Sequence, residues 1–124
     1  MLLPKFQVSN MESSRPDLII LGFWTEIALW PLLDEMIALF YYYPQVYVDT
    51  GVIDWLIPRK EFHVYLRRLV EAGYGKRIMF GSDNMAWPES IRLSVESIEP
   101  ADFLTPEQKR DIFYNNAVRF FRLK

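Results

Sequence analysis

Three short apolar runs, separated by stretches of helical periodicity, constrain the fold of this chain more than any other feature. The runs are residues 17–23 (DLIILGF), 45–49 (QVYVD) and 77–81 (RIMFG). Short runs rich in aliphatic and β-branched residues are typical of strands buried on both faces, as in parallel sheets. Strands that alternate with helices pair in parallel through right-handed crossovers. The pattern therefore predicts an α/β fold.

The stretches after the first two runs have the period of amphipathic helices. The first helix follows Pro31 and ends at Pro44. Its apolar residues form two adjacent rows: Leu32, Met36 and Leu39, then Leu33, Ile37 and Phe40. The second helix carries its apolar residues at Phe62, Leu66, Leu69 and Val70. Gly73 stands where a residue in the left-handed conformation would end this second helix.

Two further helices follow the third run. Pro88 suits the first turn of a helix whose buried face would be Ile91, Val95 and Ile98. The last helix has the clearest start signal, because Thr105 can cap it, Pro106 takes its first position and Gln108 stands three residues after the cap. The buried face of this last helix would be Ile112, Phe113, Ala117 and Phe120.

The 124 residues are expected to form one domain. Residues 1–17 carry Ser, Asn, Pro and Arg without a period and are interpreted as an irregular lead-in, so the single α/β domain would span residues 18–124. A sheet of three strands leaves two open edges, which an apolar chain is not expected to leave bare. We therefore expect association, either as a homo-oligomer or with a complementing chain.

Composition excludes several classes of partner. The net charge of -2 argues against the broad basic face that binding to nucleic acid requires. The chain has no cysteine, which rules out disulfides and thiolate metal sites. The apolar stretch from Leu18 to Tyr43 is interrupted by Glu26, Asp34 and Glu35, and each carboxylate would cost about 2.5 to 3.5 kcal/mol within a bilayer. A membrane span is not expected, and no signal peptide is recognised, so the cytoplasm is the expected location.

Two carboxylates follow predicted strands directly. Asp49 closes the second run, and Asp83 comes two residues after the third. Functional groups gather at the carboxyl ends of strands in open α/β sheets and in (β/α)₈ barrels. The same positions also suit an aspartate that caps a helix or forms a turn. The spacing leaves both interpretations open for each residue.

Three segments together resemble the end of the amidohydrolase-related (amidohydrolase 2 type) metal-dependent hydrolases. They are YPQVYVDTG, then KRIMFGSDNMAWPE about thirty residues later, and LTPEQKRDIFYNNAVRFFRL at the C-terminus. The resemblance covers about Trp30 to Lys124, and its fairly specific features are the Gly-Ser-Asp that follows a buried strand and the Asn-Ala pair of the last helix. It implies a partial (β/α)₈ barrel, of the TIM type, made of about three C-terminal βα units and a final helix.

The resemblance assigns a role to Asp83. In that family the Asp after the eighth strand binds a catalytic divalent metal, most often zinc, and accepts a proton from the attacking water. A metal lowers the pKa of bound water toward about 7, so that hydroxide can attack a carbonyl carbon of a small-molecule substrate. Asp83 is thus the implied metal ligand and catalytic residue. The activity implied is hydrolysis of a carbonyl-type bond by metal-activated water, or a related decarboxylation.

The chain also departs from the family pattern. A full barrel needs about 250 residues, so the 124 residues would supply its last three βα units. The paired His expected after the first strand belongs to the other half of the barrel. Ile27 stands where the family has a later His, and Ile cannot bind a metal. The neighbouring Glu26 would point to the other face of a strand.

These departures leave a second hypothesis beside the enzyme. The chain would then be a catalytically inactive, truncated relative that acts as an interaction module or has no function alone. His63, the only histidine, lies inside a helical pattern beside Arg67 and is interpreted as a boundary residue rather than a ligand. Whether the chain is an enzyme therefore depends on residues that would join Asp83.

Overall fold

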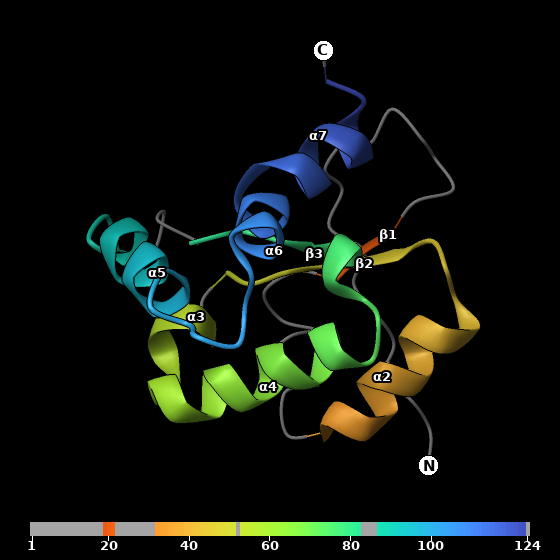
Figure 1. The fold of residues 1–124 in the computed structure, drawn as a ribbon, viewed down its shortest axis with the longest axis horizontal. Coiled ribbons are helices and arrows are strands. Elements are labelled where there is room, and N and C mark those ends of the chain that lie inside the picture. Colours follow the sequence, from red (N-terminus) through yellow and green to blue (C-terminus); the bar gives the residue numbers. More distant parts are fainter. Residues whose placement is uncertain (1–18, 22–31, 52, 83–86, 124) are drawn as a thin grey trace.

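The computed structural model describes residues 19–21, 32–51, 53–82 and 87–123. Its elements are β1 (Ile19–Leu21), α2 (Leu33–Tyr42), β2 (Val46–Asp49), α3 (Ile53–Leu56), α4 (Arg59–Glu71), the 3₁₀ turn η2 (Gly75–Arg77), β3 (Ile78–Met79), α5 (Ser90–Ile98), α6 (Pro106–Arg110), the π-helical segment η3 (Asp111–Asn115) and α7 (Asn116–Phe121) (Figure 1). The predicted lead-in, residues 1–17, lies outside the described residues.

The strands form one parallel sheet in the order β1-β2-β3. Ile19 pairs with Val46 and Leu21 with Val48, while Val48 and Asp49 pair with Ile78 and Met79. Each strand lies within one of the apolar runs of the sequence, and consecutive strands are neighbours. The predicted α/β fold with parallel strands is confirmed.

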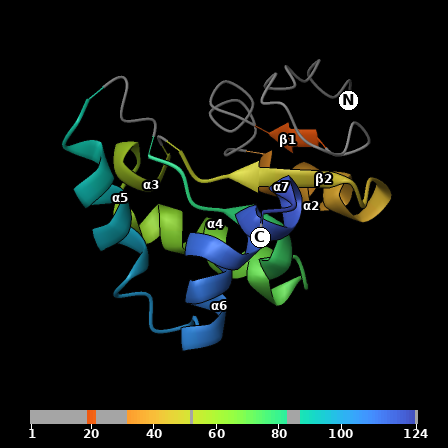
Figure 2. The same ribbon diagram turned by 90° about the horizontal axis from the view of Figure 1, so that it is seen from above.

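The side chains of β2 alternate between two apolar clusters. Val46 and Val48 are buried in the main core, whose other members come largely from α2 and α4. Tyr47 packs against Phe120 of α7 with ring centroids 4.9 Å apart, on the opposite face of the strand. Figures 1 and 2 together place α4 and α7 on opposite sides of the strands. Helices therefore contact both faces of this sheet.

Two helix-end predictions are confirmed. Gly73 follows α4 with a φ of 94°, a conformation that costs other residues strain. Thr105 caps α6: its hydroxyl accepts the Gln108 N–H at 3.1 Å, and the Gln108 side chain accepts the Thr105 N–H at 2.9 Å. Pro106 occupies the first position of α6, as predicted.

The predicted buried face of α5 is correct at Ile98 and wrong at Ile91. Ile91 is 46% exposed and Val95 is half-buried, whereas the fully buried residues of the helix are Ser90, Ser94, Ser97 and Ile98. The helix begins at Ser90, and Pro88 lies in the preceding turn. The reason is tertiary: the serine side of α5 packs against α3, where Ser94 finds a carboxylate to bind.

Among the helices in the described ranges, none has the length and the apolar character that crossing a membrane requires.

Candidate functional site

Asp49 ends β2 and lies directly beneath the loop that follows β3. Its Oδ1 atom accepts the N–H of Gly51 at 2.6 Å, which is a local turn of the kind aspartate forms readily. A Cβ atom added to Gly81 would collide with the Asp49 carboxylate. Because Gly81 has no side chain, the loop after β3 can pass against this carboxylate. The carboxyl ends of β2 and β3 therefore meet at Asp49.

Asp83 lies outside the described residues, so its predicted role as metal ligand and catalytic residue stays a prediction. The two residues before it are well anchored. The N–H of Gly81 donates to Thr50 Oγ1 at 3.2 Å, and the indole N–H of Trp55 donates to the carbonyl of Ser82 at 2.7 Å. The chain through Ser82 is therefore held at the carboxyl end of the sheet.

A buried carboxyl group, Asp54, lies behind this loop. Its side chain is 2% exposed, and both of its oxygens accept hydrogen bonds from hydroxyl groups. Thr50 Oγ1 donates to Oδ2 at 3.0 Å, and Ser94 Oγ donates to Oδ1 at 2.7 Å. These bonds join the residue after β2, helix α3 and helix α5 in one polar network.

The environment of Asp54 raises its pKa to about 7. Burial is the largest cause, because the charged carboxylate loses its hydration. The hydrogen bonds from Ser94 and Thr50 oppose this by stabilising the ionised form, and the nearby charge of Asp49 adds to the rise. Asp54 therefore changes protonation state near neutral pH.

Neither Asp54 nor its partners were expected from the sequence. Two signals could have indicated them. Thr50 and Asp54 are four residues apart, and the serines of α5 recur at positions 90, 94 and 97, which is one side of a helix. A polar stripe at helical spacing indicates a buried face when a carboxylate on another element is available to bind it.

The described ranges contain no group of three or more histidine, aspartate or glutamate side chains that could hold a metal ion. Asp54 has both oxygens engaged by hydroxyl donors. Ile27, which stands at the position of the family's later His, and its neighbour Glu26 lie outside the described residues, as does Asp83. The described part of the chain therefore does not by itself fit the metal that the resemblance implies.

His63 is a structural residue of α4. Its Nε2 atom lies 2.7 Å from the carbonyl oxygen of Ser97, and its ring packs edge-on against Phe103 with centroids 5.4 Å apart. The ring is half-buried at the boundary between α4 and α5. Its interpretation as a boundary histidine agrees with these contacts.

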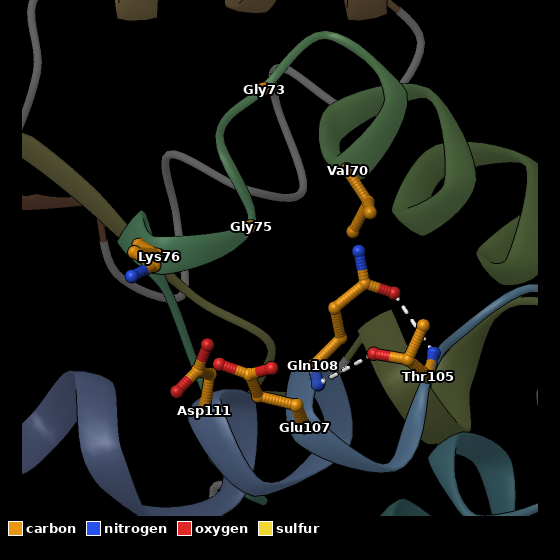
Figure 3. Close-up of a pocket in the computed structure, with 8 residues that line it drawn as sticks. All are labelled: Val70, Gly73, Gly75, Lys76, Thr105, Glu107, Gln108 and Asp111. Atoms are coloured by element: carbon orange, nitrogen blue, oxygen red, sulfur yellow. Dashed lines mark hydrogen bonds between the residues drawn. The ribbon is translucent and has the colours of Figure 1, made fainter.

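A pocket of about 330 Å³ lies at the other end of the sheet, beside η2, which leads into β3. Figure 3 shows that its polar lining includes Thr105 and Gln108, whose side chains bond each other's backbone at the start of α6. Lys76, Glu107 and Asp111 complete the charged part of the lining. The pocket thus lies near the amino end of β3, whereas barrel folds place their catalytic residues at the carboxyl ends of the strands.

Parallel strands, helical connections and a loop pinned across the strand ends define an α/β protein with its candidate site at the carboxyl end of the sheet. The chain belongs to the amidohydrolase family, whose model, described as "Amidohydrolase", matches residues 22–123. Members of this family are generally (β/α)₈ barrels that commonly use divalent metals. No curated protein and no solved structure matches the chain. The family resemblance stated from the sequence is confirmed.

Proposed function

We propose that this chain forms the last three βα units of an amidohydrolase barrel and takes part in metal-dependent hydrolysis of a carbonyl-type bond, or a related decarboxylation. The observation that carries the proposal is the loop after β3, which Thr50 and Trp55 tie across the carboxyl end of β2. This loop leads to Asp83, and barrel enzymes place their catalytic residues at that end of the strands. Sequential order of the parallel strands also supports the proposal.

In this proposal the divalent metal, with zinc as the first choice, supplies an activated water when bound. Asp83 would hold the metal with its carboxylate and would accept a proton from that water. The remaining ligands come from residues outside the described part of the chain or from another chain. The described residues form three strands, fewer than the eight of a closed barrel, so in this proposal a second copy of the chain supplies further strands. The substrate would be a small molecule.

Metal content tests the proposal directly. Purified protein is equilibrated with zinc, dialysed and analysed for metal, beside Asp83→Asn and the control Asp102→Asn, which changes an exposed carboxylate of another loop. We expect stoichiometric zinc in the parent protein and in the control, and its loss in Asp83→Asn. Equal zinc in all three proteins, or none in any, contradicts an Asp83 metal site in this chain.

The interaction module remains the second candidate, because the end of α2 is exposed and aromatic. Tyr41 and Tyr42 are 73% and 72% exposed, and Tyr43 follows them with about half of its surface in solvent. Adjacent exposed aromatics favour a protein interface. A second copy of this chain is the proposed partner, as in the predicted homo-oligomer.

Sedimentation velocity at micromolar concentration distinguishes this candidate. We expect a dimer that dissociates when Tyr41 and Tyr42 are both changed to Ser. The dimer should persist in Tyr114→Ser, which alters another exposed tyrosine, in η3. A monomer in the parent protein contradicts self-association.

A further inference from the structure

The geometry points to Asp54 as a positioning residue that sets, through Thr50, how the loop leading to Asp83 is held. This inference rests on the proposed function for its biological meaning, since the loop matters most if Asp83 is a ligand. The contacts that carry it belong to described residues.

Two adjacent residues of α3 are linked by hydrogen bonds to two adjacent residues of the loop after β3. Asp54 binds the Thr50 hydroxyl at 3.0 Å, and that hydroxyl accepts the Gly81 N–H at 3.2 Å. Trp55, the next residue of α3, donates its indole N–H to the Ser82 carbonyl at 2.7 Å. A displacement of α3 therefore moves both attachments of the loop together.

Helix α5 fixes the orientation of Asp54 from behind. Ser94 Oγ donates to Asp54 Oδ1 at 2.7 Å, and Ser97 Oγ donates to the carbonyl of Ser94 at 2.7 Å. With both oxygens bound and almost no exposure, the carboxyl group has one available orientation. Its oxygen Oδ2 consequently points at Thr50.

The Thr50 hydroxyl has one proton and two acceptors within reach. Asp54 Oδ2 lies at 3.0 Å and the carbonyl oxygen of Gly81 at 3.4 Å. When Asp54 is ionised, the Thr50 hydroxyl donates its hydrogen bond to Oδ2 of the carboxylate, because a hydrogen bond to a charged acceptor is stronger than one to a neutral carbonyl. When Asp54 is protonated at Oδ2, its O–H donates to Thr50 Oγ1 instead. The Thr50 hydroxyl is then available to donate a hydrogen bond to the carbonyl oxygen of Gly81. Protonation of Asp54 thus adds a hydrogen bond to the loop, and ionisation removes it.

Charged groups on two neighbouring elements face Asp54. Asp49 of β2 is close enough for its charge to raise the pKa of Asp54. Arg59 of α4 lines, with Asp54 and Trp55, a pocket of about 200 Å³. The side of α5 that packs on Asp54 presents the hydroxyl of Ser94, which is neutral. His63 of α4 contacts α5 through the carbonyl of Ser97 and is an ionisable side chain on that side of the junction.

Nuclear magnetic resonance on the metal-free protein tests the inference. The Gly81 amide and the Trp55 indole N–H report on the two attachments of the loop, and the variant Trp55→Phe assigns the indole signal. We expect both signals to shift with pH together, with a midpoint near the pKa of about 7 of Asp54. Asp54→Asn should abolish both shifts. Thr50→Val, which keeps the branched shape and removes the hydroxyl, should abolish the shift at Gly81. Persistence of either shift in the corresponding variant overturns the inference.

A control variant, a substitute variant and a comparison with zinc binding make the result decisive. His63→Gln should leave the titration of Gly81 and Trp55 unchanged, and loss of the titration in that variant assigns it to the imidazole and overturns the inference. If Asp54→Asn does not fold, Ser94→Ala replaces it, because loss of that hydrogen bond should raise the midpoint by about one pH unit. An unchanged midpoint in Ser94→Ala overturns the inference. If zinc binding depends on Asp83 but the Gly81 and Trp55 signals do not shift with pH, the positioning role is contradicted and the proposed function stands. If those signals shift with pH but zinc binding does not depend on Asp83, the proposed function is contradicted and the positioning role stands.

Discussion

The buried side of α4 and the junction between α3 and α5 are equally inaccessible to water but opposite in chemistry. Phe62, Leu66 and Leu69 of α4 are fully buried among apolar side chains. Ser94 is fully buried too, and so is Asp54 beside it. Apolar burial has no preferred direction, whereas hydrogen bonds require particular distances and angles. The α4 face therefore supplies stability, and the α3–α5 junction supplies a defined geometry next to the candidate site.

The largest expected effect comes from truncating a buried aromatic side chain on the apolar face of α4. Phe62→Ala should lower the free energy of unfolding by about 3–5 kcal/mol, because a large buried ring is lost and a cavity remains. Urea denaturation followed by circular dichroism measures the change. Val64→Ala, on the exposed side of the same helix, serves as the matched control and should have a small effect. Equal losses in the two variants would contradict the assigned core.

The second prediction concerns how the buried carboxyl group of Asp54, at the α3–α5 junction, makes the stability of the protein depend on pH. The pKa of Asp54 is about 7 in the folded chain and 3.8 for an unperturbed aspartate, so the folded state holds this proton more tightly than the unfolded state. Its contribution to stability is therefore best below about pH 4, declines as pH rises to about 7 and is constant above that. The total loss is at most about 4 kcal/mol.

Unfolding measured from pH 4 to pH 8 checks this sign. The difference in stability between the parent protein and Asp54→Asn isolates the contribution of Asp54 from the other carboxylates. We expect Asn at this position to become progressively more favourable relative to Asp as the pH rises. A difference that does not change with pH would contradict the raised pKa.

The third prediction separates two serines of the same buried stripe. Ser94→Ala should destabilise the protein by about 1–2 kcal/mol because it leaves a carboxylate oxygen of Asp54 without its donor. Ser90 Oγ is buried and has no hydrogen-bond partner among the described residues. Ser90→Ala should therefore be neutral or stabilise by up to about 1 kcal/mol. Chemical denaturation at pH 7 measures both, and changes of the same sign and size would mean that the network does not distinguish these serines.

The smallest effect is expected on the outer side of α5. Arg92 pairs with Glu89 and Glu96 on the helix surface, where water and salt screen the charges. Arg92→Gln should leave the urea midpoint unchanged within error, and raising the salt concentration should not alter that result. A clear loss of stability would show that the exposed side of α5 matters as much as its buried serines.

Local patterns in the sequence determined the elements of the fold. Three apolar runs, the helical periods between them, Gly73 and the Thr105 capping box all predict features that the structure contains. Each depends on residues close together in the chain, so backbone preference and hydrophobic spacing suffice. The family resemblance carried by the segments around Asp49 and Asp83 is likewise a property of the sequence, while the role of Asp83 as a ligand stays a prediction.

Only the tertiary structure decided which side of α5 is buried and which carboxyl group is perturbed. Hydrophobic periodicity favoured Ile91, but the serines turn inward because α3 presents Asp54 to them. The pKa of Asp54 depends on burial, which only folding provides, and on Ser94, a partner forty residues away in the chain. A sequence shows which groups can form hydrogen bonds, but the cost of burying them, and hence their chemistry, is set by the neighbours that folding provides.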